Sequence, residues 1–346
     1  MRQLQKTPTI QDVARAAMVS TATVSRALST PERVSESTRA RISAAIHETG
    51  YTLNQAARSL RQRVAKTILV ALPDIRNTFF SSILDAIERE ATSRGYDVIV
   101  ANLYFGQDTA RRLQNYMLSN RADGLILFDG SLRAETLTAF ALPPYSVPVV
   151  MACEEVSNNN FPTVVTDNEV AAIRATRHLL DLGHRRIGHI MGPDSNVVAQ
   201  DRLSGFRKAM DKAGIAVRPD WIFRGNFEMA SGFAAASRYM ALAEKPSAMF
   251  AANDESAIGF LSGLRRHGLE CPRDISMVGF DDLDVAAHYL PPLTTMRQPR
   301  ETLGRIAAET LIDMLEEAEL ARGPTRIVLT SELVVRDSTA QAKDAG

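Results

Sequence analysis

The feature that most constrains this 346-residue chain is an alternation of apolar runs with amphipathic segments, which begins at Thr67. The runs are continuously apolar, as in parallel strands that are covered on both faces. Strands that alternate with helices predict a parallel α/β sheet. The strand-like runs are TILVALPD, DVIVANL, GLILF, VPVVMAC, TVVTDN, RIGHIMG, SAMFAAN and DISMVGFDD. The predicted helices are 80–94, 109–120, 169–182, 202–213, 229–243 and 255–267.

The number of strand and helix units favours two sheets over one. We expect the chain to pass from one sheet to the other near 166–168 and again near 293–299. A third crossing is predicted near 323–326. Residues 300–320 are predicted to form a helix that returns to the first lobe, and 327–335 to form a late strand in the second.

Upstream of this body, Ile10–Leu28 predicts two short helices joined by a tight turn. Thr9 and Asp12 have the spacing of a capping pair, and Ser20 is a good N-cap for the second helix. That helix presents small polar residues and Arg26 on one side. Such a helix fits the major groove of DNA, where side chains reach base edges. An ordinary helical hairpin is the alternative.

A third helix is predicted after Ser35, ending before Gly50, and a basic segment follows it. Within that segment, Asn54–Arg61 is helical in pattern but too short to be stable alone in water. Ala57 and Leu60 share one face, and Arg58 can meet phosphates. The segment is either a flexible linker or a helix that folds on DNA, and both can hold.

Charge is unevenly spread along the chain. Residues 1–64 hold 10 Lys and Arg against 4 Asp and Glu, whereas the remainder holds 30 against 36. A basic head on an acidic body indicates a polyanionic partner for the head. Two distant cysteines do not indicate a disulfide framework. The sequence has neither a membrane-spanning apolar stretch nor a signal peptide, so we expect a cytoplasmic protein with no membrane partner.

The stretches VSTATVSRAL, RVSESTRARI and GYTLNQAARSLR, followed by RLSGF, AANDE and GFDD, resemble the LacI/GalR family of bacterial transcription regulators. The resemblance implies an all-α helix-turn-helix head and an α/β body with two periplasmic-binding-protein-like lobes of parallel sheets around a ligand cleft. The head would be 1–51, the hinge helix and linker 52–65, and the effector-binding and dimerisation domain 66–340. Lobe 1 would comprise about 66–165 plus 297–325, and lobe 2 about 166–296 plus 326–340.

The resemblance also assigns DNA contacts. The family's recognition positions fall on Thr21, Ala22 and Arg26, with neighbours close to the DNA backbone, and its minor-groove leucine falls on Leu60. Met18 replaces a common turn glycine, and Leu53 replaces a common hinge proline. The predicted DNA-binding residues are Ser20, Thr21, Ala22, Thr23, Ser25, Arg26, Asn54, Ala57, Arg58 and Leu60.

Ligands of open α/β sheets bind at the carboxyl ends of the strands. Polar residues and two phenylalanines follow the predicted strands, and such a set suits a sugar or a nucleoside. Asp254 and Asn168 are interpreted as helix caps. Arg202, Asn253 and Asp281 match the family's effector-binding motifs. The predicted effector-binding residues are Phe79, Phe80, Glu154, Arg202, Asn253, Asp281 and Gln298.

Enzyme motifs are missing from the sequence. It contains no dinucleotide-binding glycine motif after the first strand, no phosphate-loop lysine motif and no G-x-S-x-G elbow. The six histidines do not have zinc-site spacing, and no cofactor or metal is expected. We therefore predict a repressor that binds a double-stranded operator as a homodimer under the control of a sugar or nucleoside. Within the family, TATVSRAL, FPTVVTDN and PPLTTMRQPR resemble a nucleoside-responsive member, which implies a nucleoside, although sugar-responsive members share much of them. The alternative is a transport-type binding protein, which the head and the lack of a signal peptide disfavour.

Overall fold

A computed structural model describes residues 8–51, 64–103, 109–130, 147–156, 160–316 and 325–343. The chain divides into two compact units, residues 1–65 and 66–346. Most of the predicted hinge, including Asn54, Ala57, Arg58 and Leu60, lies outside the described residues. Within the ranges that are described, no helix is long and apolar enough to cross a membrane.

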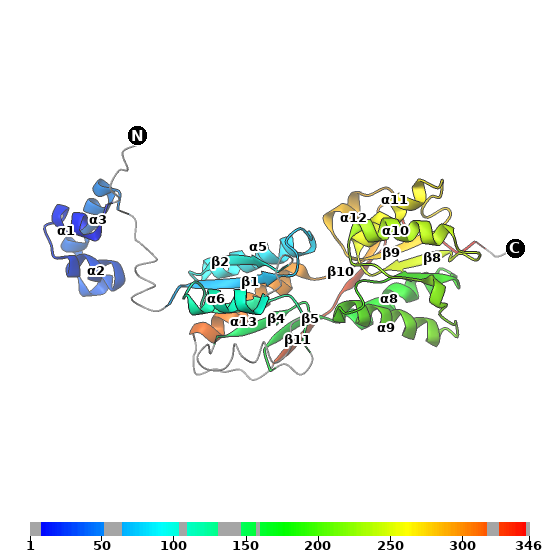
Figure 1. Cartoon of the computed structure of the whole chain (residues 1–346). Helices are drawn as coiled ribbons and strands as arrows, with labels where there is room; N and C mark the ends of the chain where they lie inside the picture. The colour runs from blue at the N-terminus through cyan, green and yellow to red at the C-terminus, as the bar shows by residue number, and fades with distance from the viewer. Residues whose placement is uncertain are drawn as a thin grey trace. The chain divides into compact units, whose positions relative to one another are not determined.

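The first unit is a small helical module (Figure 1). The predicted pair of helices in 10–28 and the third helix that ends before Gly50 are confirmed. They enclose a core of small and β-branched side chains, formed by Val13, Ala14, Ala17, Val24, Ile42 and Ala45. The elements are α1 (Ile10–Ala16), α2 (Thr21–Ser29), the 3-10 helix η1 (Pro31–Arg33) and α3 (Glu36–Thr49).

Two of the caps predicted for this module form as hydrogen bonds, whereas Ser35 precedes α3 without a capping bond from its side chain. The Thr9 amide donates to Asp12 Oδ2 at 2.9 Å, and the Thr23 amide donates to Ser20 Oγ at 3.1 Å. Met18, in the turn between α1 and α2, has a φ of 51°, a left-handed conformation that is unfavourable for a residue with a side chain. The chain therefore keeps the turn geometry without the glycine that suits it.

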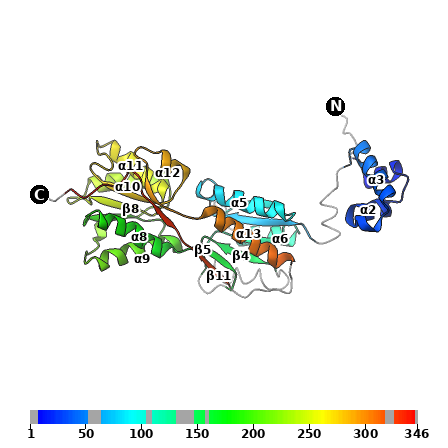
Figure 2. The same cartoon turned by 180° about the vertical axis from the view of Figure 1, so that it is seen from behind.

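Lobe 1 is the part of the body built on a six-stranded sheet in the order β11-β5-β4-β3-β1-β2, with every pair parallel. Helices α5 and α13 pack side by side on one face of this sheet (Figure 2). The strands are β1 (Thr67–Leu72), β2 (Asp97–Asn102), β3 (Gly124–Leu127), β4 (Val149–Ala152), β5 (Thr163–Thr166) and β11 (Arg326–Leu329). The helices are α5 (Phe79–Ser93), α6 (Thr109–Leu118) and α13 (Arg300–Glu316).

Lobe 2 is built on a second six-stranded sheet in the order β12-β10-β9-β8-β6-β7, in which β12 is the antiparallel strand. Helices α8 and α9 pair with each other, as do α10 and α11. The strands are β6 (Ile187–Ile190), β7 (Ile222–Phe223), β8 (Ala248–Ala251), β9 (Ser276–Asp281), β10 (Thr294–Arg297) and β12 (Glu332–Val334). The helices are α8 (Asn168–Asp181), α9 (Val197–Lys212), η2 (Pro219–Trp221), α10 (Met229–Met240), α11 (Asp254–Arg265) and α12 (Asp284–His288).

The chain passes between the lobes at three places. Two of them, after β5 and after β10, lie where the sequence predicts them. The third prediction is wrong: Arg326–Leu329 does not enter lobe 2 but pairs in parallel with β5 of lobe 1. The crossing instead falls at Thr330 and Ser331, which separate β11 from β12. A residue pattern that reads as one strand is thus divided between two sheets.

One helix begins earlier than its sequence pattern predicts. Helix α9 starts at Val197 rather than at Arg202, because the Asn196 side chain caps it by accepting from the Ala199 amide at 3.0 Å. Its pairing with α8 is close: a Cβ built on Gly205 would lie 2.3 Å from the Glu169 carbonyl oxygen. This close approach fixes the helix that carries Arg202 against the start of α8.

Candidate functional site

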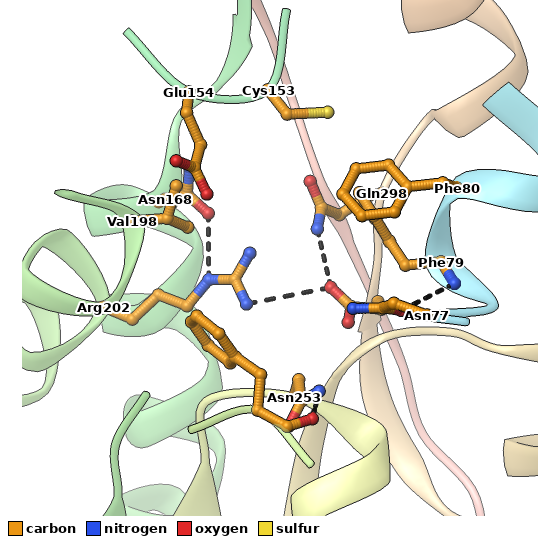
Figure 3. A pocket seen from close by; sticks show the side chains of 12 residues that line it. Asn77, Phe79, Phe80, Cys153, Glu154, Asn168, Val198, Arg202, Asn253 and Gln298 are labelled. Carbon is orange, nitrogen blue, oxygen red and sulfur yellow. Dashed lines mark hydrogen bonds and ion pairs between the residues drawn. The ribbon is translucent and has the colours of Figure 1, made fainter. Parts of the chain in front are cut away.

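A cavity lies between the two lobes, where the carboxyl ends of their strands meet (Figure 3). Its walls combine three aromatic rings with amide and charged side chains. All seven residues predicted to bind an effector line it. The lining residues are Asn77, Phe79, Phe80, Cys153, Glu154, Asn168, Val198, Arg202, Phe227, Asn253, Asp281 and Gln298.

Arg202 is the central charged side chain of the cavity. Its Nε donates to Asn168 Oδ1 at 2.9 Å, and its Nη1 donates to the Ala252 carbonyl. The same Nη1 lies 3.7 Å from Asp281 Oδ1, and the guanidinium covers the Phe280 ring at 3.7 Å from its centroid. Because the side chain is about 5% exposed, these contacts replace water around its charge.

Asp281 ends strand β9 in a left-handed conformation with a φ of 114°. Its Oδ1 accepts a hydrogen bond from Gln298 Nε2 at 2.7 Å. Burial raises its pKa to about 6, although the positive charges of Arg202 and Arg300 and the Gln298 hydrogen bond act in the opposite direction. The Asp281 carboxylate is therefore fixed at the cavity wall, in a backbone conformation that carries strain.

Glu154 follows strand β4 and reaches the cavity from lobe 1. Its Oε2 accepts from the Gly130 amide at 2.9 Å and its Oε1 from Asn196 Nδ2 at 2.7 Å. Burial raises the pKa of Glu154, while these two hydrogen bonds lower it. The carboxylate is consequently a fixed acceptor whose orientation depends on both lobes.

Asn253 lines the cavity and also caps a helix. Its Oδ1 accepts from the Ser256 amide at 3.1 Å, which caps α11, and its Nδ2 donates to the Phe227 carbonyl at 2.7 Å. It therefore starts a helix and also fixes the loop that brings Phe227 into the cavity. Phe227 itself has a left-handed φ of 67°.

Phe79 and Phe80 form the apolar wall contributed by lobe 1. Their ring centroids lie 5.2 Å apart at an interplanar angle of 76°, and Phe80 contacts Phe128 at 5.6 Å in the same edge-to-face manner. The Phe79 amide donates to Asn77 Oδ1 at 2.9 Å, which fixes the first turn of α5. This wall offers apolar ring surface opposite the charged groups of lobe 2.

Two cap interpretations from the sequence are wrong. Asp167, and not Asn168, caps α8, since its Oδ1 accepts from the Val170 amide. Asn168 instead donates to the Thr166 carbonyl at 3.0 Å and turns its oxygen towards Arg202. Asp254 caps no helix; its carboxylate accepts from the Leu283 amide and from Thr295 Oγ1 beneath the cavity.

Sequence reasoning missed Val198 and Phe227 as lining residues. Val198 lies in the first turn of α9, which the pattern places outside the helix. Phe227 follows β7, a two-residue strand with no sequence signal of its own. Asn77 and Cys153 stand after predicted strands, where the strand-end rule selects them, but they were not among the predicted effector-binding residues.

In the head, the six predicted DNA-binding residues that the structure describes belong to α2 or to its cap. Thr21, Ala22 and Arg26 are exposed, Ser20 caps the helix, and Val24 faces the core. Helix α2 therefore presents a polar, partly cationic face beside its buried one. The remaining predicted positions, Asn54 to Leu60, fall outside the described residues.

Across the described part of the chain, no cluster of three or more His, Cys, Asp or Glu side chains could hold a metal ion. His189 is buried in lobe 2, where Nδ1 contacts the Phe250 carbonyl at 2.9 Å and burial lowers its pKa to about 3. Cys153 lines the cavity, and burial raises its pKa. Neither group is arranged as a nucleophile beside a base.

Comparisons with known proteins agree with both units. A model of bacterial regulatory proteins of the lacI family matches residues 9–54, and one of a periplasmic binding protein-like domain matches residues 176–339. The HTH-type transcriptional repressor CytR of Escherichia coli (strain K12) is 36% identical over 337 residues, which cover 96% of each chain.

Solved structures give the same result. A Lac repressor dimer bound to operator and the anti-inducer ONPF has a TM-score of 0.87 at 29% identity, covering 97% of this chain and 100% of that one. A LacI family transcriptional regulator from Enterococcus faecium with bound ribose has a TM-score of 0.72 at 27% identity, covering 80% of this chain and 100% of that one. This chain therefore belongs to the LacI family of bacterial regulatory proteins and is a DNA-binding transcriptional regulator, not an enzyme.

Proposed function

We propose that this chain represses transcription as a homodimer on operator DNA, and that an uncharged sugar or nucleoside in the inter-lobe cavity sets its operator affinity. The observation that carries this proposal is the buried Arg202–Asp281 pair beside the Phe79–Phe80 wall. Paired charges bind the hydroxyls of a ligand, and the rings accept its apolar face. A relative solved with ribose and another solved as a dimer on operator support the two halves of the proposal.

The charge balance of the cavity favours an uncharged effector. Among the described residues that line it, Arg202 is the single cation, whereas Glu154 and Asp281 are acids. Arg202 is already engaged by Asn168, Ala252 and Asp281. A phosphate would therefore enter beside two carboxylates with no free cation to neutralise it, which is costly in a buried site.

Between the two uncharged classes, the aromatic wall makes a nucleoside the first to test. Phe79 and Phe80 present rings on which a base can pack, and Asp281 and Arg202 face them with groups suited to ribose hydroxyls. A simple sugar would use the charged groups but would leave part of this wall uncovered.

The head is proposed to bind the operator through the exposed face of α2. Arg26 would donate to a base edge in the major groove, while Ser20, Thr23 and Ser25 lie near the phosphates. Leu60 stays a prediction for the minor groove. Because its proposed partner is operator DNA, the proposed location of the protein is the cytoplasm.

A homodimer would place two heads on two half-sites. One surface of lobe 1 suits such a contact: β2 is the outermost strand of its sheet, and Val100 on it is 37% exposed. An unpaired strand edge with apolar side chains is a favourable surface for association.

The proposal is tested with full-length protein and an operator selected from random DNA. Operator affinity is measured by fluorescence anisotropy with and without each ribonucleoside and pentose, and with the matching phosphates as controls. At least one uncharged compound should change operator affinity tenfold or more, in either direction, and raise the melting temperature through mass action. The proposal is wrong if only phosphorylated compounds change operator affinity, or if no compound changes it.

A further inference from the structure

One side chain outside the cavity is bonded to both lobes at once. Asn196 Oδ1 accepts from the Ala199 amide at 3.0 Å, which caps α9 in lobe 2. Its Nδ2 donates to Glu154 Oε1 of lobe 1 at 2.7 Å. The two ends of a single amide thus hold the first turn of α9 and the end of β4.

The acceptor of this inter-lobe bond is itself fixed. Glu154 Oε2 accepts from the Gly130 amide at 2.9 Å, so the carboxylate is anchored to the backbone of lobe 1. If the lobes separated, Glu154 would lose one of its two donors and Asn196 would lose its acceptor. Hydrogen bonds to charged groups are among the stronger ones in proteins. Losing this bond makes separation of the lobes unfavourable, so the bond stabilises the closed arrangement.

Helix α9 connects the Asn196–Glu154 hydrogen bond to the cavity. Val198 and Arg202, both lining residues, lie on this helix within two turns of Asn196. The distance between α9 and β4 therefore decides how close Arg202 comes to the lobe 1 wall. Elsewhere around the cavity, Leu283 of lobe 2 packs into the core of lobe 1, so the Asn196–Glu154 bond and this apolar contact are separate restraints on closure.

We infer that Asn196 is a positioning residue that couples occupancy of the cavity to closure of the lobes, through its hydrogen bond to Glu154. This inference rests on the proposed function, because it assumes that the effector binds in the cavity. A ligand that contacts both Glu154 and Arg202 stabilises the same closed arrangement as Asn196, and the two effects reinforce each other.

The chain offers a probe of closure that needs no ligand. Cys153 lines the cavity beside Glu154, and Cys271 lies in lobe 2, where its thiol donates to the Ser338 carbonyl. Alkylation of full-length protein by iodoacetamide, followed by peptide mass spectrometry, gives the rate at each cysteine. The Cys271 rate serves as an internal reference for folding of lobe 2.

Asn196→Asp is the decisive variant. Aspartate caps a helix as well as asparagine does, so α9 should keep its start. Its carboxylate faces that of Glu154, and repulsion replaces the hydrogen bond. We expect Cys153 to react about tenfold faster, with the Cys271 rate unchanged. An added carboxylate by itself disfavours the thiolate and would slow the reaction, so an increase reports opening.

A second substitution keeps the inference testable. In Asn196→Asp combined with Glu154→Gln, the glutamine oxygen can accept from Gly130 and its amide can donate to the new carboxylate. The Cys153 rate should return to within about twofold of wild type. Asn196→Ser, which retains a capping hydroxyl but cannot span to Glu154, should give an intermediate rate. The charged neighbours that act on Glu154, Asp129 and Arg202, are the same in all variants.

The outcomes separate the inference from the proposed function. If Asn196→Asp leaves the Cys153 rate at the wild-type value, or if the double variant does not restore it, the positioning role of Asn196 is wrong. If no ribonucleoside or pentose at millimolar concentration slows alkylation of Cys153 in the wild-type protein, the proposed effector site is wrong, whatever the variants show.

Discussion

Gln298 Nε2 donates to Asp281 Oδ1 at 2.7 Å, so a residue on the crossing between the lobes fixes the carboxylate at the end of β9. The same oxygen lies 3.7 Å from Arg202 Nη1. One carboxylate atom therefore contacts both the crossing and the central cation of the cavity. Changes at Asp281 should therefore affect ligand binding through Arg202.

Asp281→Asn should weaken effector binding at least tenfold, because the buried guanidinium of Arg202 loses its charged partner. A hydrogen bond to a charged group contributes about 1.5–3 kcal/mol. Isothermal titration with the active compound measures the loss. Operator binding in the absence of effector should change by less than threefold, and a larger change would mean that Asp281 mainly supports the fold.

The same variant should alter the pH dependence of stability. Burial raises the pKa of Asp281 from 3.8 to about 6 in the folded protein, so the folded state binds this proton more tightly than the unfolded state. Its contribution to stability is complete below pH 3.8 and is lost as the pH rises through 6. At about 1.4 kcal/mol for each pKa unit, the change is on the order of 3 kcal/mol.

Urea unfolding at pH 4.5, 5.5 and 7.5 tests this slope. Asp254 and Glu255 also have raised pKa values, so the informative quantity is the difference between wild type and Asp281→Asn. The free energy of unfolding of wild type should fall relative to the variant as the pH rises. Parallel curves would show that Asp281 keeps an ordinary pKa.

Asn168 should contribute to effector affinity by orienting Arg202. Asn168→Ala removes the acceptor of Arg202 Nε and should weaken binding about tenfold, which corresponds to roughly 1.4 kcal/mol. Asn168→Asp keeps an acceptor for that nitrogen and should recover most of the affinity. Equal losses in both variants would mean that Asn168 acts by holding the lobe crossing, through its bond to the Thr166 carbonyl, and not by orienting Arg202.

Arg26→Ala should weaken specific operator binding by about 1–3 kcal/mol, the range for one good base contact, while non-specific binding changes little. Arg41→Ala, which removes an exposed arginine from α3, is the matched control. Anisotropy titrations with the operator and with scrambled DNA distinguish the two kinds of binding. An equal effect of both substitutions would indicate a general charge effect.

Met18→Gly should stabilise the head. The φ of 51° strains a residue with a side chain by about 1–2 kcal/mol, and Met18 is 83% exposed, so little packing is lost. Hydrogen exchange of the buried amides of α1 and α3 measures the gain. Ala44→Gly, at an exposed position inside α3, should instead destabilise the head by about 1 kcal/mol.

The strand-end rule placed six cavity residues because parallel strands bring their carboxyl ends to one edge whatever the loops do, whereas Gln298 came from the family resemblance. It could not decide between neighbours such as Asp167 and Asn168. Either residue can cap a helix, and only the packing of α9 against α8 shows which side chain turns towards Arg202. Phe227 and Asn196 depend on tertiary contacts in the same way, since neither belongs to a periodic segment.

The prediction of the third crossing was wrong for a different reason. Residues 326–334 have the alternation of one strand. The residues of a strand determine which face is buried, but they do not determine which of two sheets the strand joins. Thr330 and Ser331 interrupt the run only in the folded protein, where β11 joins β5 and β12 joins β10.

The three passages between the lobes have a consequence for how such chains diversify. Each lobe is assembled from separate stretches of sequence, so no single segment carries a complete lobe. The head, in contrast, is contiguous and ends by residue 65. A single recombination event can therefore exchange the head or the whole body, whereas no single event can exchange one lobe alone.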